Sequence, residues 1–212
     1  PALVITFGPR EAVPIMAVAS IMANASRVAV WWREVNWPVV AAYSATGIPA
    51  AALGALTLLR LPPGVVEVAL GLFFIAMIPL RRWMARHQWR LTLVHMAMVG
   101  AGIGFLTGIV VSTGPINAPF FLAFGLVKGA YLSTEAMASL AVYLAKALTF
   151  RSMDAMPWDT LFKGLIIGST ITVGSFVAKR FVLRLDPDKF RLWMDGLLLM
   201  AGLTMLWTAV WG

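Results

Sequence analysis

The sequence contains no cysteine and only two histidines, and charged residues make up 12% of its 212 residues. The absence of cysteine excludes disulfide bonds, thiolate metal ligands and a cysteine nucleophile. A soluble domain carries about 25% charged residues, so the low charge excludes an ordinary soluble globular protein. The sequence instead has 60% hydrophobic residues, nine Trp and eighteen Gly, which is typical of a helical membrane protein.

Enzyme and nucleic-acid signatures are also missing. His87 and His95 are too few and too widely spaced for an H-E-x-x-H motif or a zinc triad, and no Ser/His/Asp set lies in register. We therefore expect no catalytic residue, no metal and no cofactor. The net charge of +8 reflects membrane orientation better than nucleic-acid binding, because no stacking aromatic residues accompany a basic groove.

Apolar runs bounded by charged residues or proline predict an all-α integral membrane protein with seven visible transmembrane spans in a lipid bilayer. The predicted spans are Ala12–Trp32, Trp37–Leu61, Pro63–Trp83, Leu91–Val111, Leu132–Phe150, Trp158–Val182 and Phe190–Trp211. Between the fourth and fifth spans, the apolar segment Gly114–Leu126 has only 13 residues, the length of a re-entrant or half-spanning segment.

The distribution of Lys and Arg predicts the orientation of the chain. If Leu91–Leu126 is a hairpin that enters and leaves on one side, eleven Lys and Arg residues lie on that side. Only Arg10, Arg60 and Arg151 lie on the other. The positive-inside rule then makes the first side cytoplasmic in a multi-pass inner-membrane protein.

Three pairs of matching segments predict an internal duplication. They are Trp37-Pro38 with Trp158-Asp159, Leu59–Pro63 with Leu183–Pro187, and Pro1–Gly8 with Pro119–Gly125. The turns at Arg33 and Arg151 fall on opposite sides, so the two repeats are inverted, an arrangement common in secondary transporters.

The predicted boundaries give an N-terminal repeat at residues 1–83, a cytoplasmic basic connection at 84–90 and a C-terminal repeat at 91–212. The N-terminal repeat lacks a partner for Leu91–Ala118, so we expect its first helix to precede Pro1.

A glycine-rich break, a later helix entered through Trp and then a basic loop together resemble the TauE/SafE (sulfite exporter, TSUP) family. The matching residues are Gly100, Gly104, Gly108, Gly114-Pro115, Pro119, Trp158 and the loop Lys179–Arg191. The resemblance covers essentially the whole chain and departs at Ser112-Thr113, where the family usually has glycine. It implies a secondary transporter for export or uptake of sulfite, thiosulfate or a sulfonate such as sulfoacetate by alternating access, and of the two directions we expect export.

The tetrapeptide Ser112-Thr113-Gly114-Pro115 is the first candidate for a binding site. Ser, Thr and Gly favour the N-cap and Pro favours the first helical position, so a half-helix is predicted to begin here. Its backbone N–H groups and dipole would bind the anion, with further donors from Ser112, Thr113 and Asn117. The alternative is an ordinary Gly/Pro turn at the membrane surface.

Two polar stripes at helical spacing form the second candidate. Glu135, Ser139, Tyr143 and Lys146 share one face of their span, and Ser20, Asn24 and Arg27 share a face of another. Ionisable residues in a span turn inward, so these side chains are predicted to surround the anion. In the alternative reading, Arg27 and Lys146 snorkel to the interface, and Asn24 only joins two helices.

Glu135 and His95 are candidates for proton coupling, although a histidine near an interface is often structural. The alternative to a transporter is a membrane enzyme acting on lipid-linked substrates, or a scaffold subunit without transport activity. The acidic residues are dispersed and form no cluster at one interface, which favours the transporter. The sequence carries no signal for an oligomeric state.

Overall fold

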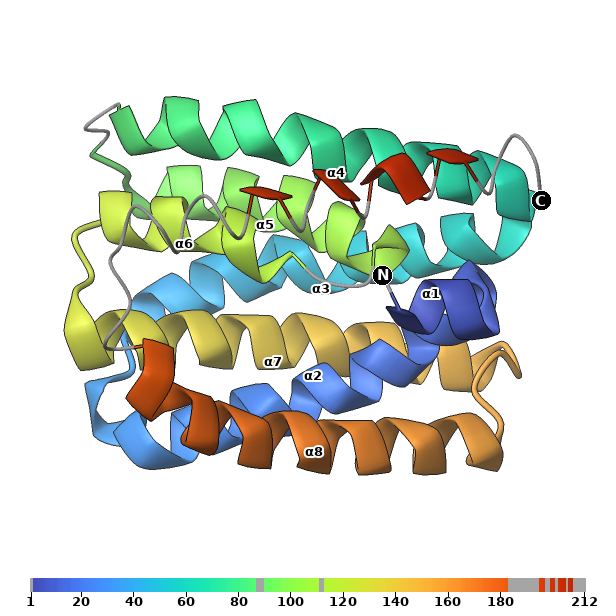
Figure 1. The fold of residues 1–212 in the computed structure, drawn as a ribbon. Coiled ribbons are helices and arrows are strands. Elements are labelled where there is room, and N and C mark those ends of the chain that lie inside the picture. The colour runs from blue at the N-terminus through green and yellow to red at the C-terminus, as the bar shows by residue number, and fades with distance from the viewer. Residues whose placement is uncertain are drawn as a thin grey trace.

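The computed structural model describes residues 2–86, 90–110 and 113–182, with short pieces between residues 195 and 207. This part of the chain is helical and contains no strand, which confirms the predicted all-α class. Its elements are α1 (Ala2–Phe7), α2 (Pro9–Trp31), the short 3-10 turn η1 (Trp32–Glu34), α3 (Trp37–Arg60), α4 (Pro63–Arg86), α5 (Leu93–Ile109), α6 (Gly114–Ala123), α7 (Lys128–Ser152) and α8 (Trp158–Val182). The long helices run lengthwise, side by side, in one bundle (Figure 1).

The first six predicted spans coincide with helices, and their ends differ by a few residues. The largest difference is α7, which begins at Lys128 and not at Leu132. Two described helices, Glu11–Glu34 and Trp37–Arg60, are long and apolar enough to cross a membrane by length and composition. The seventh predicted span, Phe190–Trp211, falls mostly outside the described residues.

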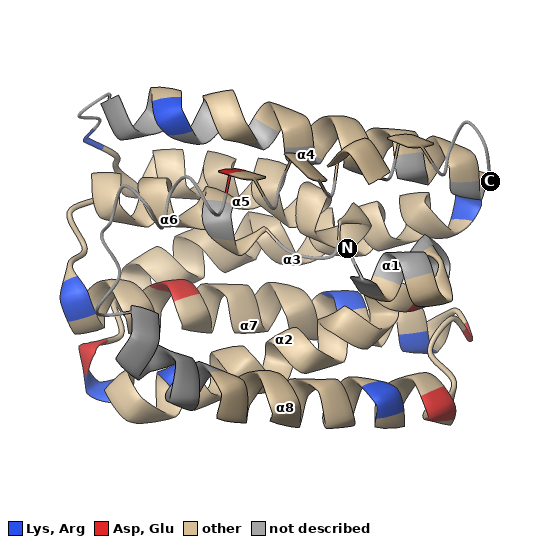
Figure 2. Ribbon diagram, in the orientation of Figure 1, with Lys and Arg blue, Asp and Glu red and all other residues tan. Residues whose placement is uncertain are grey.

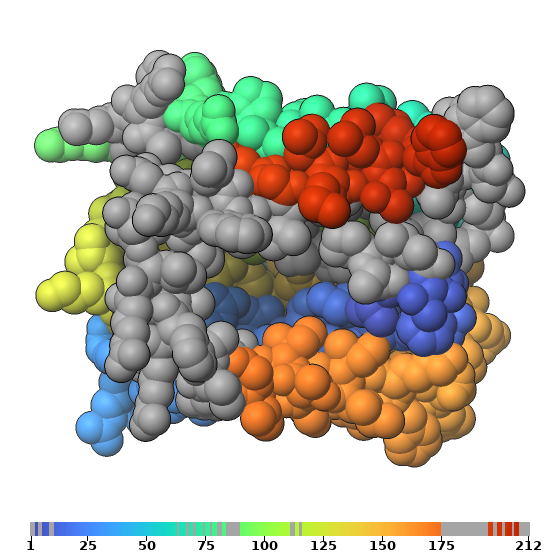
Figure 3. Space-filling view, in the orientation of Figure 1, coloured from blue at the N-terminus to red at the C-terminus, as the bar shows by residue number. Residues whose placement is uncertain are grey.

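Among the residues that the structure describes, most charged side chains belong to the two ends of the bundle (Figure 2). This is the distribution that a bilayer with a hydrocarbon core of about 30 Å demands. The C-terminal pieces lie beside α4, as the space-filling view of the same face shows (Figure 3). An ion pair of 2.6 Å between Arg82 of α4 and Asp195 holds them there.

Proline and small polar residues fix where helices begin. The side chain of Asn36 caps α3 by accepting a hydrogen bond of 3.3 Å from the N–H of Val39. Pro9 and Pro63 stand at the first positions of α2 and α4, where the missing N–H costs nothing. Gly8 precedes α2 with a φ of +74°, a backbone conformation that favours glycine.

Glycine allows α3 and α5 to pack almost backbone to backbone. A Cβ atom added at Gly104 of α5 would lie 2.5 Å from the carbonyl oxygen of Gly47 in α3. Gly100 and Gly108 of α5 and Gly54 of α3 are equally close to the facing backbone. The four-residue spacing of Gly100, Gly104 and Gly108 therefore serves close helix packing.

The helices α5 and α6 form a hairpin that leaves and returns at the same end of the bundle, as the count of Lys and Arg residues assumed. Its ends are joined by a hydrogen bond of 3.1 Å from the N–H of Leu91 to the carbonyl oxygen of Ala123. The helix α5 has 17 residues and α6 has 10, which correspond to about 26 Å and about 15 Å. Gly114, the first residue of α6, therefore lies partway along the bundle, away from the end where the hairpin closes, and it is exposed.

In the C-terminal half, α7 packs against both α2 and α3, and α8 packs against α2. Figure 1 shows α7 lying between α3 and α8 with α2 beside it. This arrangement turns one face of α7 toward α2, beside the start of α6, where the site described next is found.

Candidate functional site

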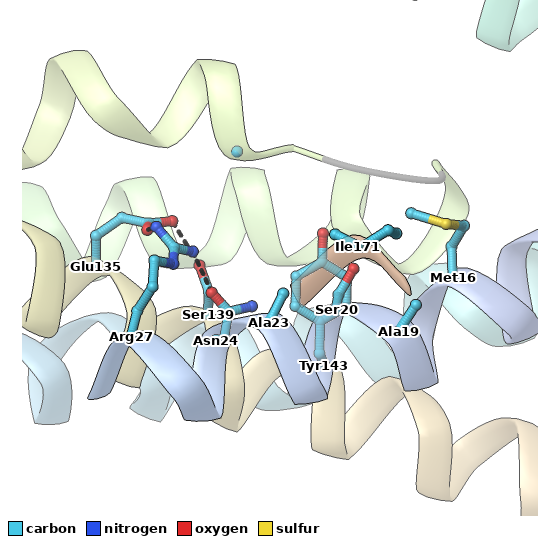
Figure 4. Close-up of a pocket in the computed structure, with 11 residues that line it drawn as sticks. Met16, Ala19, Ser20, Ala23, Asn24, Arg27, Glu135, Ser139, Tyr143 and Ile171 are labelled. Atoms are coloured by element: carbon cyan, nitrogen blue, oxygen red, sulfur yellow. Dashed lines mark hydrogen bonds and ion pairs between the residues drawn. The ribbon is translucent and has the colours of Figure 1, made fainter. Parts of the chain in front are cut away.

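A cavity of about 200 Å³ lies where α2, α7 and the first residue of α6 meet (Figure 4). Its polar lining residues are Ser20, Asn24 and Arg27 from α2, Glu135, Ser139 and Tyr143 from α7, and Gly114 from α6. Its apolar lining residues are Met16, Ala19 and Ala23 from α2 and Ile171 from α8. The cavity holds one basic and one acidic side chain, both at the same end, with Met16 at the other end (Figure 4).

Helical geometry explains why these polar residues face one another. On α2 they are four and three residues apart, and on α7 they are four residues apart, so each set occupies one face of its helix. Because α2 packs against α7, the two faces meet. The structure thus brings together six residues from the two predicted stripes.

An ion pair joins the two stripes. Arg27 donates from Nη1 to Oε2 of Glu135 across 2.8 Å, and from Nη2 to Oδ1 of Asn24. The Glu135 side chain is 4% exposed and the Arg27 side chain 41% exposed. Arg27 is therefore turned toward α7 and the cavity, and snorkelling away from the bundle does not describe it. Asn24 accepts its hydrogen bond from Arg27, which lies on the same helix. The alternative prediction was that Asn24 bonds to a different helix.

Asn117 lies behind the cavity. It is 2% exposed and is absent from the cavity lining. Its Nδ2 donates to Oγ of Ser139 at 3.2 Å and reaches Oε1 of Glu135 at 3.4 Å, and its Oδ1 accepts a bond of 2.9 Å from the hydroxyl of Tyr43. Ser139 donates in turn to Oε1 of Glu135 at 2.8 Å. Asn117 therefore contacts Glu135 on the side away from the cavity. This position does not favour the direct contact with an anion that the sequence predicted.

The break between α5 and α6 is held by a second set of bonds. The hydroxyls of Thr107 and Thr113 lie 2.6 Å apart, and Thr113 is 1% exposed. Lys146 of α7 donates to the carbonyl oxygens of Thr107 at 2.5 Å and Val110 at 2.8 Å. Lys146 is 0% exposed, so it does not snorkel, and neither Lys146 nor Thr113 lines the cavity.

The start of α6 offers fewer free backbone donors than predicted. Pro115 has no N–H, and the N–H of Ile116 donates to the carbonyl oxygen of Thr113 at 2.9 Å. Gly114 is the residue of this helix end that lines the cavity. Ser112, also predicted to bind the anion, lies outside the described residues.

Comparison with protein families decides the class of this protein. The family model described as sulfite exporter TauE/SafE matches residues 1–205. The chain belongs to the TauE/SafE family. The resemblance inferred from the glycine-rich break is confirmed, and the TauE/SafE assignment makes the chain a membrane protein of an anion-exporter class. No curated protein and no solved structure matches the chain.

In this TauE/SafE chain the two candidates for proton coupling have different surroundings. Glu135 lines the cavity, whereas His95 is exposed at the start of α5. The ring Nδ1 of His95 accepts from the backbone N–H of Thr92 at 3.2 Å and lies 2.7 Å from its hydroxyl. His95 therefore caps a helix, which agrees with the structural alternative for this residue.

Sequence reasoning missed two polar residues that bond to other residues in and behind the candidate site, Tyr43 and Thr107. Tyr43 lies inside a predicted apolar span, where a tyrosine hydroxyl needs a partner, so its position was a usable signal; in the structure it is 1% exposed. Thr107 sits within the glycine-rich stretch of α5, where nothing in the pattern distinguishes it from a packing residue. Ile171 gave no signal either, because a single isoleucine in a membrane-spanning helix is not distinguished from its other apolar residues.

Proposed function

We propose that the chain is a secondary transporter that exports a small sulfur-containing anion, such as sulfite or sulfoacetate, across the inner membrane. The anion binds in the cavity between α2, α7 and the start of α6. The observation that carries this proposal is the position of Arg27, the basic residue of the cavity lining. Two of its five N–H groups donate to Glu135 and Asn24. The remaining three have no partner among the described residues, and a guanidinium binds oxyanions in a bidentate fashion.

The size of the cavity supports a small cargo. Pockets for drug-sized ligands measure about 300–1,000 Å³. A cavity of about 200 Å³ suits an anion of a few heavy atoms, such as sulfite or a short sulfonate. The hydroxyls of Ser20 and Ser139 and the backbone of Gly114 add polar atoms on three sides.

The packing of the helices supports two inverted repeats, at residues 1–83 and 91–212, and transport by alternating access. Gly8 and Gly125, at matching positions, both have positive φ, +74° and +100°. Gly47 of α3 faces α7, and Gly168 of α8, exactly 121 residues later, faces α2. The cavity between α2 and α7 then lies at the interface of the repeats, where rocking of one repeat against the other exposes it to each side.

The decisive experiment is anion flux from proteoliposomes containing the purified chain, with sulfite, sulfoacetate and chloride compared in parallel. We expect flux of sulfite or sulfoacetate well above that of chloride. Arg27→Gln should abolish the flux, and Arg27→Lys should retain part of it because the charge remains. The matched control is Arg33→Gln, which removes an exposed arginine that stacks on Trp32 outside the cavity.

Folded protein that carries none of the three anions would contradict the transport proposal. Flux that survives Arg27→Gln but not Arg33→Gln would contradict the site. The orientation is tested separately by reporter fusions at Arg86 and Asp154, which the seven-span topology places on opposite sides of the membrane.

A further inference from the structure

Lys146 is a buried cation that the proposed anion site does not use. It is 0% exposed, and its ammonium donates to the carbonyl oxygens of Thr107 at 2.5 Å and Val110 at 2.8 Å. It forms no ion pair with a carboxylate of the described residues. The rings of Tyr143 and Phe150 lie 5.6 Å and 5.9 Å from its Nζ. The ammonium is therefore held by backbone oxygens and aromatic rings.

Both carbonyl oxygens belong to the C-terminal end of α5, the first half of the break. The last four carbonyls of a helix lack partners within the helix and carry negative partial charge. The last turn of α5 contains no basic residue of its own. The carbonyl of Leu106 is satisfied by the N–H of Val110 at 2.8 Å. Those of Thr107 and Val110 are satisfied from another helix, by Lys146.

This end of a broken helix is where many secondary transporters bind a coupling sodium ion, because unwound carbonyls and half-helix C-terminal ends coordinate cations. Here two backbone carbonyl oxygens at the end of α5 accept hydrogen bonds from a side-chain ammonium, that of Lys146. Gly114, which lines the cavity, follows Val110 by four residues, so the end of α5 that Lys146 binds is close in sequence to one wall of the proposed site.

We propose that the Lys146 ammonium is a tethered cation that takes the place of a coupling metal ion at the α5 break. Two consequences follow. Transport does not require Na⁺, and a chain without the ammonium gains a vacant site that a monovalent metal ion fills. The first consequence, transport without Na⁺, rests on the proposed transport function. The second consequence, binding of a metal ion in the absence of the ammonium, depends only on the break between α5 and α6.

The test uses the absence of cysteine as a background. Val110→Cys places one thiol at the break, where Val110 is 2% exposed. The rate at which a maleimide labels this thiol is measured in NaCl and in choline chloride, with no anion substrate present. With Lys146 intact we expect slow labelling that is equal in both salts. With Lys146→Ser we expect labelling in choline chloride to be about tenfold faster than in the Lys146 protein, because two buried carbonyls lose their hydrogen-bond partner. In NaCl we expect the labelling of Lys146→Ser to be slower than in choline chloride, because Na⁺ fills the vacant site.

Two further variants separate charge from bulk. Lys146→Arg keeps a cation and should label slowly in both salts. Lys163→Met removes a lysine of α8 that pairs with Glu11 and Asp159, and it should label like the parent. Slow labelling of Lys146→Ser in choline chloride would overturn the proposal, and so would fast labelling that NaCl fails to slow.

A measurement on the unmodified chain covers the case in which Lys146→Ser does not fold. Sulfite or sulfoacetate flux is compared in sodium-free and sodium-containing buffers. We expect equal rates, and a requirement for Na⁺ would overturn the proposal. If labelling behaves as expected but no anion is transported, the transport function fails while the tethered cation stands. If transport is found but labelling of Lys146→Ser ignores Na⁺, only the cation proposal fails.

Discussion

Arg27 on α2 and Glu135 on α7, 108 residues apart in the sequence, form an ion pair of 2.8 Å beside the cavity. The two partners are unequally buried, since the Glu135 side chain is 4% exposed and the Arg27 side chain 41%. Removing the arginine leaves a buried carboxylate without its cation, whereas removing the carboxylate leaves an arginine that is itself only partly buried. The two partners should therefore not be equivalent in mutagenesis.

We expect Arg27→Gln to destabilise the protein more than Glu135→Gln. The first variant should lose about 1–3 kcal/mol, below the range for fully buried pairs because Arg27 is partly exposed. Glutamine at position 135 can still accept the bonds from Ser139 and Asn117, so the second should lose less than about 1 kcal/mol. Unfolding in mild detergent, followed by the fluorescence of the nine Trp residues, measures both.

The control for this comparison is the more exposed pair of Lys163 and Glu11, whose side chains are 33% and 38% exposed. Glu11→Gln should change the free energy of unfolding by about 0–1 kcal/mol, because pairs near the surface contribute little. Equal losses for Arg27→Gln and Glu11→Gln would mean that the pair at the cavity is no more important than a surface pair.

Glu135 is the carboxylate among the cavity-lining residues, and this position predicts a role in proton coupling. Protonation of its carboxylate would release Arg27 for the anion. We expect an imposed proton gradient to accelerate sulfoacetate flux in the parent and to have no effect in Glu135→Gln. Sulfoacetate is the better cargo here because its sulfonate takes up no proton near neutral pH.

His95→Gln is the matched control for coupling, because His95 caps α5 away from the cavity lining. It should respond to the gradient like the parent. The assignment to Glu135 is wrong if His95→Gln loses the response while Glu135→Gln keeps it.

The sequence was sufficient to predict the helices and the two polar stripes, because apolar length and helical spacing are local properties of the chain. The sequence was not sufficient to predict which side chains bond to one another across helices. The pairing of Arg27 with Glu135 depends on the packing of α2 against α7, which no local pattern encodes. Asn117 was expected at the cavity because it lies one turn into α6, but the rotation of α6 turns it toward Tyr43 and Ser139.

Lys146 shows a different limit of pattern reasoning. It lies 11 residues after Glu135, on the same helical face, so its place in the stripe was predicted correctly. The neighbours of that face change along α7, however. Near Glu135 the face borders the cavity, and near Lys146 it meets the end of α5. Residues on one stripe can therefore have unrelated surroundings.

The close packing of α3 and α5 predicts a contrast between two glycines of the same helix. A Cβ at Gly104 would lie 2.5 Å from the backbone oxygen of Gly47, whereas a Cβ at Gly102 would meet no atom within 4 Å. Gly104→Ala should cost about 1–3 kcal/mol by overpacking. Gly102→Ala should be neutral or stabilise by up to about 1 kcal/mol, since alanine favours the helix. Thermal unfolding of the two variants in the same detergent tests this contrast. Similar unfolding temperatures would contradict the close packing of α3 and α5 at Gly104.

The hydroxyl of Tyr43 predicts an effect on binding from outside the cavity. It donates to Oδ1 of Asn117 at 2.9 Å, and so fixes which end of that amide faces Glu135 and Ser139. Tyr43→Phe leaves a buried acceptor without a donor, which costs about 1–3 kcal/mol, and it frees the amide to turn. We expect a several-fold higher half-saturating concentration of sulfoacetate, with a larger increase for Asn117→Ala. Tyr131→Phe, on the more accessible part of α7, should match the parent in the same flux assay. An unchanged half-saturating concentration in Tyr43→Phe would show that the hydrogen bond from Tyr43 to Asn117 does not affect anion binding.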